Sequence, residues 1–561
     1  MDVPIVLLLL TALMGYLVAI DRALSQTKLI WFVVQACVFY ILAIGLRSEK
    51  NIGRVARLLV IGTLVLALIG LVGTDWRQVR LINLPGLYDR IPRLLSGLPS
   101  SGIDPDPNTF NPRRIGAAIA MLLPLSVVLL FFGRPRWDRL LALVTLLVGT
   151  VVLILSQAIM GLFGLSVALL LIGVWWRRRL LWVALAGLVA LVAVIILYDP
   201  RQIALALLDI NHPLGIAILL RLDIWSRSLA MIYDLPFTGI GLDNFPLVQT
   251  NFYIGHLLGP EPHAHNLILQ TMNDLGIFGL LGLIWLLLAI FFTVFQGYRT
   301  TTSRHMQLLL LGLAGGILAF IAGGLLDSMA LGDRPTLILW VMMGLSTAIA
   351  INARREAAAT HNMWWDVATS RWLLFVPALL LLLALLFLPS ARQRNVSLVM
   401  AHQAIYKART TGELQADKAK ATVSELNHAL ILDADNPELH GALASLYAWQ
   451  GAEEASLNAL RRRVALDKHD PLSRYAPFLK WRLQLTGEPL PGPSEGMLQI
   501  YKPWRNRFPD RAETYALTAL VWQESMGNTE RASSFLHAGL DKGAEPRELL
   551  LEYLNQIKTD G

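Results

Sequence analysis

The sequence predicts an all-α protein, in which a polytopic membrane domain is followed by a soluble α-helical domain. Of the 561 residues, 55% are hydrophobic and 16% are charged, and the mean hydropathy is +0.53. Soluble domains contain about 45 to 50% apolar residues, so this composition excludes an ordinary soluble protein. Long apolar runs end near Pro389, and Glu, Lys, Gln and Ala become frequent after it. We therefore predict a membrane domain at 1–390 and a separate helical domain at 391–561.

The apolar runs have the length of transmembrane helices, which need about 17 to 25 residues to cross about 30 Å of hydrocarbon. The first run lacks a basic n-region and a small-residue cleavage site, so we expect a helix there and not a cleaved signal. About eleven runs qualify, at residues 3–20, 29–46, 57–74, 115–132, 139–156, 159–175, 180–198, 272–295, 306–326, 335–352 and 371–389.

Basic residues in the short loops predict the orientation, because Lys and Arg near helix ends are retained on the cytoplasmic side. When the runs are threaded alternately, these basic loops fall on one side; they contain Arg47, Lys50, Arg54, Arg57, Arg134, Arg136, Arg139, Arg177, Arg178, Arg179, Arg299, Arg304, Arg354 and Arg355. We therefore expect the cytoplasmic (inner) membrane, a cytoplasmic N-terminus, and three segments on the outer side: 75–114, 199–266 and everything after about 390. The net charge of +8 then reflects topology, and we expect no nucleic-acid partner.

The C-terminal domain carries a pattern typical of tetratricopeptide repeats. Asn436-Pro437 and Asp470-Pro471 are 34 residues apart, which is the period of that repeat. Between them, small and large residues follow the order of such a helix pair, at Leu443, Ala444, Tyr447, Gly451 and Ala455. A second unit is expected at 512–540, after a Pro/Gly-rich insert at 487–496. The alternative is a generic helical bundle. In either case the domain is expected to bind a partner and not to catalyse.

Two histidines mark the expected chemistry. His263 and His265 lie where the polar loop 199–266 meets an apolar run. Imidazole accepts a proton near neutral pH, and an apolar surround keeps it neutral, so either ring would suit a general base acting on a hydroxyl. Arg221 in the same loop offers a planar pair of donors to phosphate oxygens. Together they favour a transfer to a hydroxyl in which the guanidinium stabilises an anionic leaving group.

The residues around this loop form a motif in a defined order: Arg221, Trp225, Pro236-x-x-Gly239-x-Gly241, His265-Asn266 and Asp274-Leu275-Gly276. The motif resembles the one shared by the O-antigen ligase and O-antigen polymerase superfamily, which includes O-oligosaccharyltransferases. The resemblance covers about 215–285 by motif and about 1–390 by hydropathy. We expect the two glycines to form turns, because no P-loop helix pattern follows them.

The resemblance implies roles for individual residues. His265, which directly precedes Asn266 as in the family, would be the catalytic base, with His263 and the acidic Asp327 beside it. Arg221, Asn266 and Trp225 would bind substrate. The chain departs from the family at Ser156–Gly161, where members often carry an arginine in a Ser-Arg-Gly stretch; here Arg113 and Arg114 are the expected substitutes for the missing diphosphate contact.

Structural alternatives stay open for these residues. Either histidine alone would serve to cap the following helix or to satisfy a loop carbonyl. Arg221 would serve as an interfacial residue, and Trp225 would pack or anchor at the interface. Asp327 would end its helix.

The sequence thus predicts a metal-independent, inverting glycosyltransferase that needs no cofactor. Its donor would be a polyprenyl-diphosphate-linked glycan, and its acceptor a polysaccharide, lipid or protein hydroxyl. Its C-terminal domain would meet a large acceptor or a protein partner. No metal is expected, because the outer loops hold only Asp104-Pro-Asp106 at carboxylate spacing, and the single Cys37 excludes a thiol cluster. Two other classes remain: a polyprenyl-glycan flippase, which should carry charges within its helices, and a non-catalytic membrane scaffold.

Overall fold

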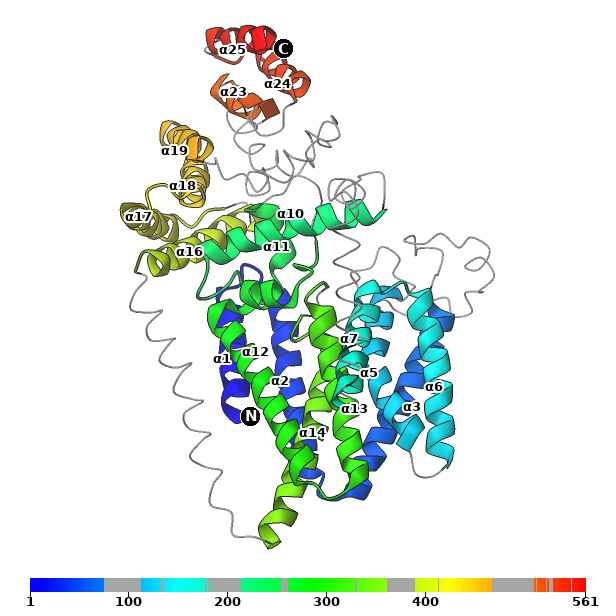
Figure 1. Cartoon of the computed structure of the whole chain (residues 1–561). Coiled ribbons are helices and arrows are strands. Elements are labelled where there is room, and N and C mark those ends of the chain that lie inside the picture. The colour runs from blue at the N-terminus through cyan, green and yellow to red at the C-terminus, as the bar shows by residue number, and fades with distance from the viewer. Residues whose placement is uncertain are drawn as a thin grey trace.

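A computed structural model provides the structure of the chain. It describes residues 1–74, 112–132, 136–176, 179, 182, 213–253, 261–327, 330–360, 389–411, 413–466, 509–510, 512–520, 522–523, 528–545 and 547–560. The regular elements in these ranges are helices, as Figure 1 shows. The protein is therefore an all-α polytopic membrane protein, as the sequence predicted.

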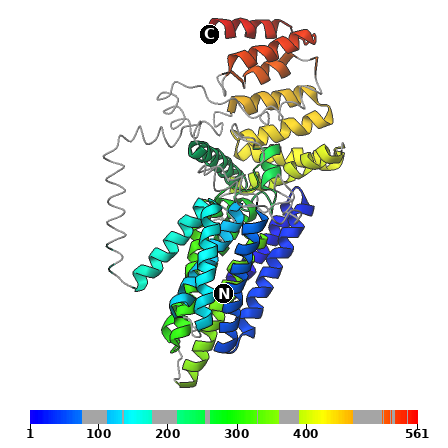
Figure 2. The same cartoon turned by 90° about the vertical axis from the view of Figure 1, so that its right-hand side faces the viewer.

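Long apolar helices form a bundle beneath the other elements (Figures 1 and 2). They are α1 (Asp2–Val18), α2 (Arg22–Gly45), α3 (Glu49–Gly73), α5 (Pro112–Phe132), α6 (Arg136–Leu155), α7 (Ile159–Trp176), α12 (Leu267–Thr300), α13 (Arg304–Gly324) and α14 (Leu337–Thr360). Among the described residues, seven helices are long and apolar enough to cross a membrane, and α1 and α7 are shorter apolar helices. Of the expected spans, all but one residue of 180–198 and all but the last residue of 371–389 lie outside the described residues.

The bundle packs through small residues and exposes large apolar ones, as expected for helices surrounded by lipid. α13 lies against α5 and α7. A Cβ atom on Gly164 of α7 would come within 2.3 Å of the Ala319 carbonyl oxygen, so only glycine permits this approach. On the outside, Ile41 and Leu288 are 67% and 64% exposed. Such exposure of large apolar side chains fits a lipid-facing surface.

One end of the bundle is basic. Arg57 on α3 pairs with Asp138 on α6 at 2.7 Å, and Ser303 donates to Glu49 across 3.2 Å. The starts of α3, α6 and α13 therefore meet at this end. The described basic residues at these helix ends, which the sequence assigned to one side, do lie together. That this end is cytoplasmic remains a prediction.

Two further helices cross the opposite end of the bundle: α10 (Pro213–Asp234) and α11 (Phe245–Asn251). The loop between them turns into the bundle, where the Ile240 N–H donates to the Asn273 carbonyl at 2.7 Å and the Ile277 N–H donates to the Pro236 carbonyl at 2.8 Å. α12 kinks at Gly276, whose φ is 67°. A Cβ there would lie 2.1 Å from the Phe237 oxygen, so this glycine serves a turn and a close backbone approach.

The C-terminal helices pack as neighbours in sequence: α16 (Pro389–Thr411) with α17 (Ala416–Leu432), α18 (Pro437–Gln450) with α19 (Glu453–Leu466), and α23 (Ala512–Leu520) with α24 (Thr529–Asp541) and α25 (Arg547–Asp560). Asn436 caps α18, and Gly451 ends it with φ 74°. The tetratricopeptide assignment stays a prediction, because Asp470 and the 487–496 insert lie outside the described residues.

The helix α16 docks on α10 and α11. The Asn395 side chain accepts from the Phe237 and Thr238 N–H groups at 3.0 and 3.3 Å. The Asn436 amide donates to Asp234 at 2.9 Å. The helix α16 and the helices α10 and α11 also share one apolar cluster, which includes Leu398, Ile405, Ile224, Met231 and Phe245. The C-terminal helices therefore support the loop region that precedes α12.

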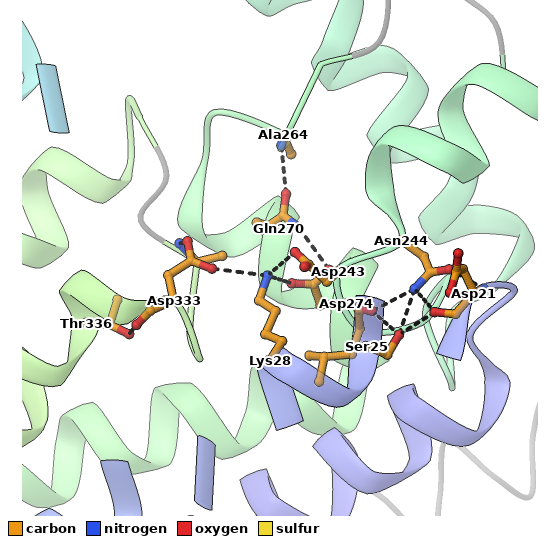
Figure 3. A network of polar contacts seen from close by, with 12 residues as sticks. Asp21, Ser25, Lys28, Asp243, Asn244, Ala264, Gln270, Asp274, Asp333 and Thr336 are labelled. Carbon is orange, nitrogen blue, oxygen red and sulfur yellow. Dashed lines mark hydrogen bonds and ion pairs between the residues drawn. The ribbon is translucent and has the colours of Figure 1, made fainter. Parts of the chain in front are cut away.

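A buried lysine joins four segments beneath this loop region (Figure 3). The Lys28 ammonium on α2 lies 3.2 Å from Asp243 Oδ1, 3.2 Å from Asp274 Oδ2 and 3.5 Å from Asp333 Oδ1. Its side chain is 6% exposed. Asp274 also accepts from the Gln270 amide at 2.9 Å, and Gln270 accepts from the Ala264 N–H at 2.7 Å. The lysine is thus connected to the backbone between the two histidines.

Loss of this lysine should destabilise the protein. Lys28→Met would leave the buried Asp274 carboxylate, which is 4% exposed, without its cation, and loss of one partner of a buried ion pair typically costs about 3 to 5 kcal/mol. We expect a clearly lower Tm for the purified variant in detergent. Arg22→Met, at the exposed first turn of the same helix, is the control and should melt as wild type. A wild-type Tm for Lys28→Met would contradict this role.

Candidate functional site

The candidate site lies at the end of the bundle opposite the basic end, where residues 261–266 lead into α12. Asn266 begins the helix: its Oδ1 accepts from the Ile268 and Leu269 N–H groups at 2.9 and 3.0 Å. Its Nδ2 donates to the Leu325 carbonyl at 2.8 Å. Both ends of the amide are therefore occupied in capping α12 and in joining it to the end of α13. Substrate binding by Asn266 remains a prediction, and its contacts are those of a helix cap.

His265 is held between two carboxylates. Its Nδ1 lies 2.8 Å from Asp327 Oδ1, and its Nε2 lies 3.4 Å from Glu261 Oε2. The side chain is 22% exposed, so the ring is reachable from the aqueous side. The backbone of His265 has φ 49°, in the left-handed region that non-glycine residues seldom adopt. Such strain is often found at functional sites, where neighbouring contacts hold it in place.

The carboxylates favour the charged imidazole. Burial lowers the pKa of His265, but the hydrogen bonds to Asp327 and Glu261 and the charge of Asp327 outweigh it, so the pKa is raised above 6.5. Burial raises the pKa of Asp327, yet the hydrogen bond and charge of His265, with help from His263 and Arg221, lower it to about 2. Asp327 is therefore ionised at neutral pH and orients the ring through Nδ1.

His263 has a different environment. Burial, the charge of His265 and the more distant charges of Arg114 and Lys28 lower its pKa to about 3, against the opposing effect of Asp327. The ring is thus neutral at physiological pH. Its Nδ1 accepts from the His265 N–H at 3.3 Å, and the two ring centroids are 4.2 Å apart. This contact helps to hold His265 in its unusual backbone conformation.

Arg221 on α10 lies beside the pair. Its Nε donates to the Leu326 carbonyl at 3.2 Å, next to Asp327, and its Nη1 donates to the Ala217 carbonyl at 3.1 Å. Burial lowers its pKa, which the charges of Asp327 and Glu261 oppose. Its Nη2 has no hydrogen-bond partner within the described part of the chain. The guanidinium is therefore positioned by two carbonyls with donor capacity left for an anion.

Arg113 and Arg114 begin α5 at the same end. The charge of Arg113 acts on Arg221, and that of Arg114 acts on His263, so both lie near the histidine pair. The turn at 156–158 also packs here, because a Cβ on Gly116 would lie 2.1 Å from the Ser156 hydroxyl. The stretch that lacks the family arginine is thus next to the two arginines expected to replace it.

Trp225 lies one turn after Arg221 on α10. Its ring packs against the apolar cluster shared by α10, α11 and α16, and its indole N–H is buried without a partner. A buried ion pair between Arg227 and Asp223 follows on the same helix. These contacts favour packing for Trp225, and its proposed contact with substrate remains a prediction.

His263, His265 and Asp327 also have the spacing of a cation site. One ligand atom each from His263, His265 and Asp327 lies within 4.8 Å of the others. In the structure His265 Nδ1 and Asp327 Oδ1 hydrogen-bond to each other, and His263 Nδ1 accepts from the His265 backbone N–H. The arrangement therefore suits proton transfer as it stands, and the expected absence of a metal is a prediction to be tested by chelation.

The residues that sequence reasoning missed include Lys28, Asp243, Glu261 and Asp333. Lys28 stands just before the apolar run predicted at 29–46, and a charged residue at that depth is a signal of function. Glu261 precedes His265 by four residues, but no pattern in the loop marks it. Asp333 meets Lys28 only through tertiary packing, so sequence alone held no signal for it.

One comparison with known proteins found a match to part of the chain. A family model described as O-antigen ligase matches residues 142–284, a range that contains Arg221, His263 and His265 but not Asp327. No curated protein matches the chain. The matched segment contains both the motif and the histidine loop, which is residues 261–266. Over this segment the chain is similar to the O-antigen ligase family.

Proposed function

We propose that this protein transfers a glycan from a polyprenyl diphosphate donor to an acceptor hydroxyl at the outer face of the cytoplasmic membrane. The similarity of residues 142–284 to O-antigen ligase supports a membrane glycan ligase or polymerase-like role. The observation that carries the finer proposal is the 2.8 Å bond between His265 and Asp327, with the Arg221 guanidinium beside it.

His265 is the proposed base. With Nδ1–H donating to Asp327, the Nε2 lone pair is the one that accepts the proton of the acceptor hydroxyl. Asp327 stabilises the imidazolium that forms, as the acid of a hydrolase triad does. Glu261, at 3.4 Å from Nε2, stands where the acceptor must approach. We propose that it orients the incoming hydroxyl.

The bond changes balance around one carbon. The acceptor oxygen attacks the anomeric carbon as its proton passes to His265, and the bond from that carbon to the diphosphate oxygen breaks with its electron pair leaving on the diphosphate. Attack from the opposite face inverts the sugar. Arg221, whose Nη2 is available, and Arg113 and Arg114 are the proposed binders of the diphosphate. The acceptor is a polysaccharide, a lipid or a protein hydroxyl.

Removal of the base should stop transfer. We expect His265→Ala, expressed at the wild-type level in the native host, to accumulate lipid-linked glycan and lose a surface glycan, as a deletion does. Loss of a general base lowers the rate about 10²- to 10⁴-fold. His428→Ala, at an exposed histidine of α17, is the matched control. If His265→Ala keeps wild-type glycans while the deletion does not, a flippase or scaffold explains the protein better.

The pH dependence of transfer should follow His265. Only the neutral ring accepts a proton, so the rate should fall as the pH falls through the raised pKa of His265, with the acid limb above pH 6.5. In Asp327→Asn the hydrogen bond to a negative charge is lost, the pKa of His265 drops, and the limb should move to lower pH while the maximal rate decreases. Rate profiles of the two purified proteins measure this. If the acid limb of Asp327→Asn lies at the same pH as that of the wild type, the proposed pairing of His265 with Asp327 is wrong.

Chelation should leave transfer intact. His265 and Asp327 hydrogen-bond to each other, as a base and its orienting carboxylate do, so we expect the rate of purified protein to be unchanged after dialysis against EDTA. Loss of activity that returns with a divalent cation would contradict the metal-independent proposal. It would assign the cation to His263, His265 and Asp327.

A further inference from the structure

A second concave site lies at the basic end of the bundle, away from the histidine loop. It is a cavity of about 450 Å³ where α3, α6 and α13 meet. Its walls combine basic side chains with an apolar floor: Lys50, Arg54 and Arg57 with Leu129, Met306 and Leu309. The proposed transfer reaction uses none of these residues. A cavity of this composition suits a ligand with an anionic head and an apolar body.

The positive charge of this cavity is only partly neutralised. Its three basic side chains outnumber its two carboxylates: Asp138 pairs with Arg57 at 2.7 Å, and Glu49 accepts from the Ser303 hydroxyl at 3.2 Å. Lys50 and Arg54 pair with no carboxylate among the residues that the structure describes; Arg54 donates only to the neutral Asn51 amide at 3.3 Å. The two cations are four residues apart and so share a face of α3. They are available to an anion.

The same face of α3 continues as an apolar surface. Leu58, Ile61 and Val65 follow Lys50 and Arg54 at helical spacing, and their side chains are 62%, 38% and 47% exposed. A helix face that begins with cations at the membrane boundary and continues with exposed apolar side chains matches the shape of a phospholipid. The phosphate would lie at the cations, and an acyl chain would lie along the three apolar side chains.

We propose that this cavity binds the headgroup of an anionic phospholipid from the leaflet at the basic end. Negatively charged lipids are attracted to clustered Lys and Arg near helix ends, and basic pockets between membrane helices bind their headgroups. A zwitterionic phospholipid of the same acyl composition lacks the net charge that two unpaired cations select. The proposal is independent of the transfer reaction.

Lipid binding to the purified full-length protein tests this. We expect native mass spectrometry to show more retained phosphatidylglycerol than phosphatidylcholine after both are added in equal amounts. Lys50→Gln with Arg54→Gln should lower phosphatidylglycerol retention about tenfold or more, since each basic residue near an anionic surface contributes about 1 kcal/mol. Arg47→Gln with Arg355→Gln removes the same charge at the same end, outside the cavity, and should retain the lipid.

A variant that fills the cavity separates shape from charge. The nearest atom to a Cβ on Gly53 is His305 Nε2 at 3.8 Å, so a side chain can begin at this position, and Gly53→Phe adds a ring to the cavity wall. We expect it to lower phosphatidylglycerol retention with all charges kept. Equal retention of the two lipids, equal loss in the control pair, or complete displacement by millimolar inorganic phosphate would overturn the proposal. The last result would assign the site to a free anion. The glutamine pair lies on the exposed surface, so it keeps the test valid if Gly53→Phe misfolds.

Discussion

A single buried ammonium fixes the geometry on which the rest of the site depends. An unpaired charge inside a membrane domain costs several kcal/mol, so the Lys28 ammonium is stable there only with carboxylate partners. It takes them from the loop before α11, from α12 and from the loop before α14. Through Asp274 and Gln270 the same network reaches the Ala264 N–H, between the two histidines. The histidine loop is thus held in place by the hydrogen bond between the Ala264 N–H and Gln270.

The two ends of the bundle have opposite tasks. At one end, α10, α11 and the docked helix α16 share an apolar cluster with Ala264, and glycines at 239 and 276 let the α10–α11 loop and the kinked α12 approach closely. At the other end, two cations that pair with no carboxylate in the described part of the chain precede an exposed apolar face of α3. The first arrangement supports proton transfer beside an anion-binding guanidinium. The second supports a fixed position in a charged membrane. Neither requires the other, so the two proposals stand or fall separately.

Much of the fold follows from the sequence, and less of the site does. Apolar length alone locates the described membrane helices, because crossing hydrocarbon leaves a chain few other structures. The pairing of His265 with Asp327 follows in part from topology, since α12 and α13 form a hairpin that returns the end of α13 to the start of α12. Glu261 and Asp333 could not be found this way. The position of Glu261 beside the ring depends on the left-handed backbone at His265, and that of Asp333 depends on its ion pair with Lys28. Both features arise from tertiary packing.

The most direct test of the proposed reaction is the stoichiometry of its products. Purified protein in liposomes would receive a defined glycan on polyprenyl diphosphate together with the isolated acceptor from the host. We expect one free polyprenyl diphosphate for each glycan joined to the acceptor, with the anomeric configuration of the linking sugar inverted. Release of sugar to water without joining, retention of configuration, or movement of intact donor across the bilayer would contradict transfer by the His265 and Asp327 pair.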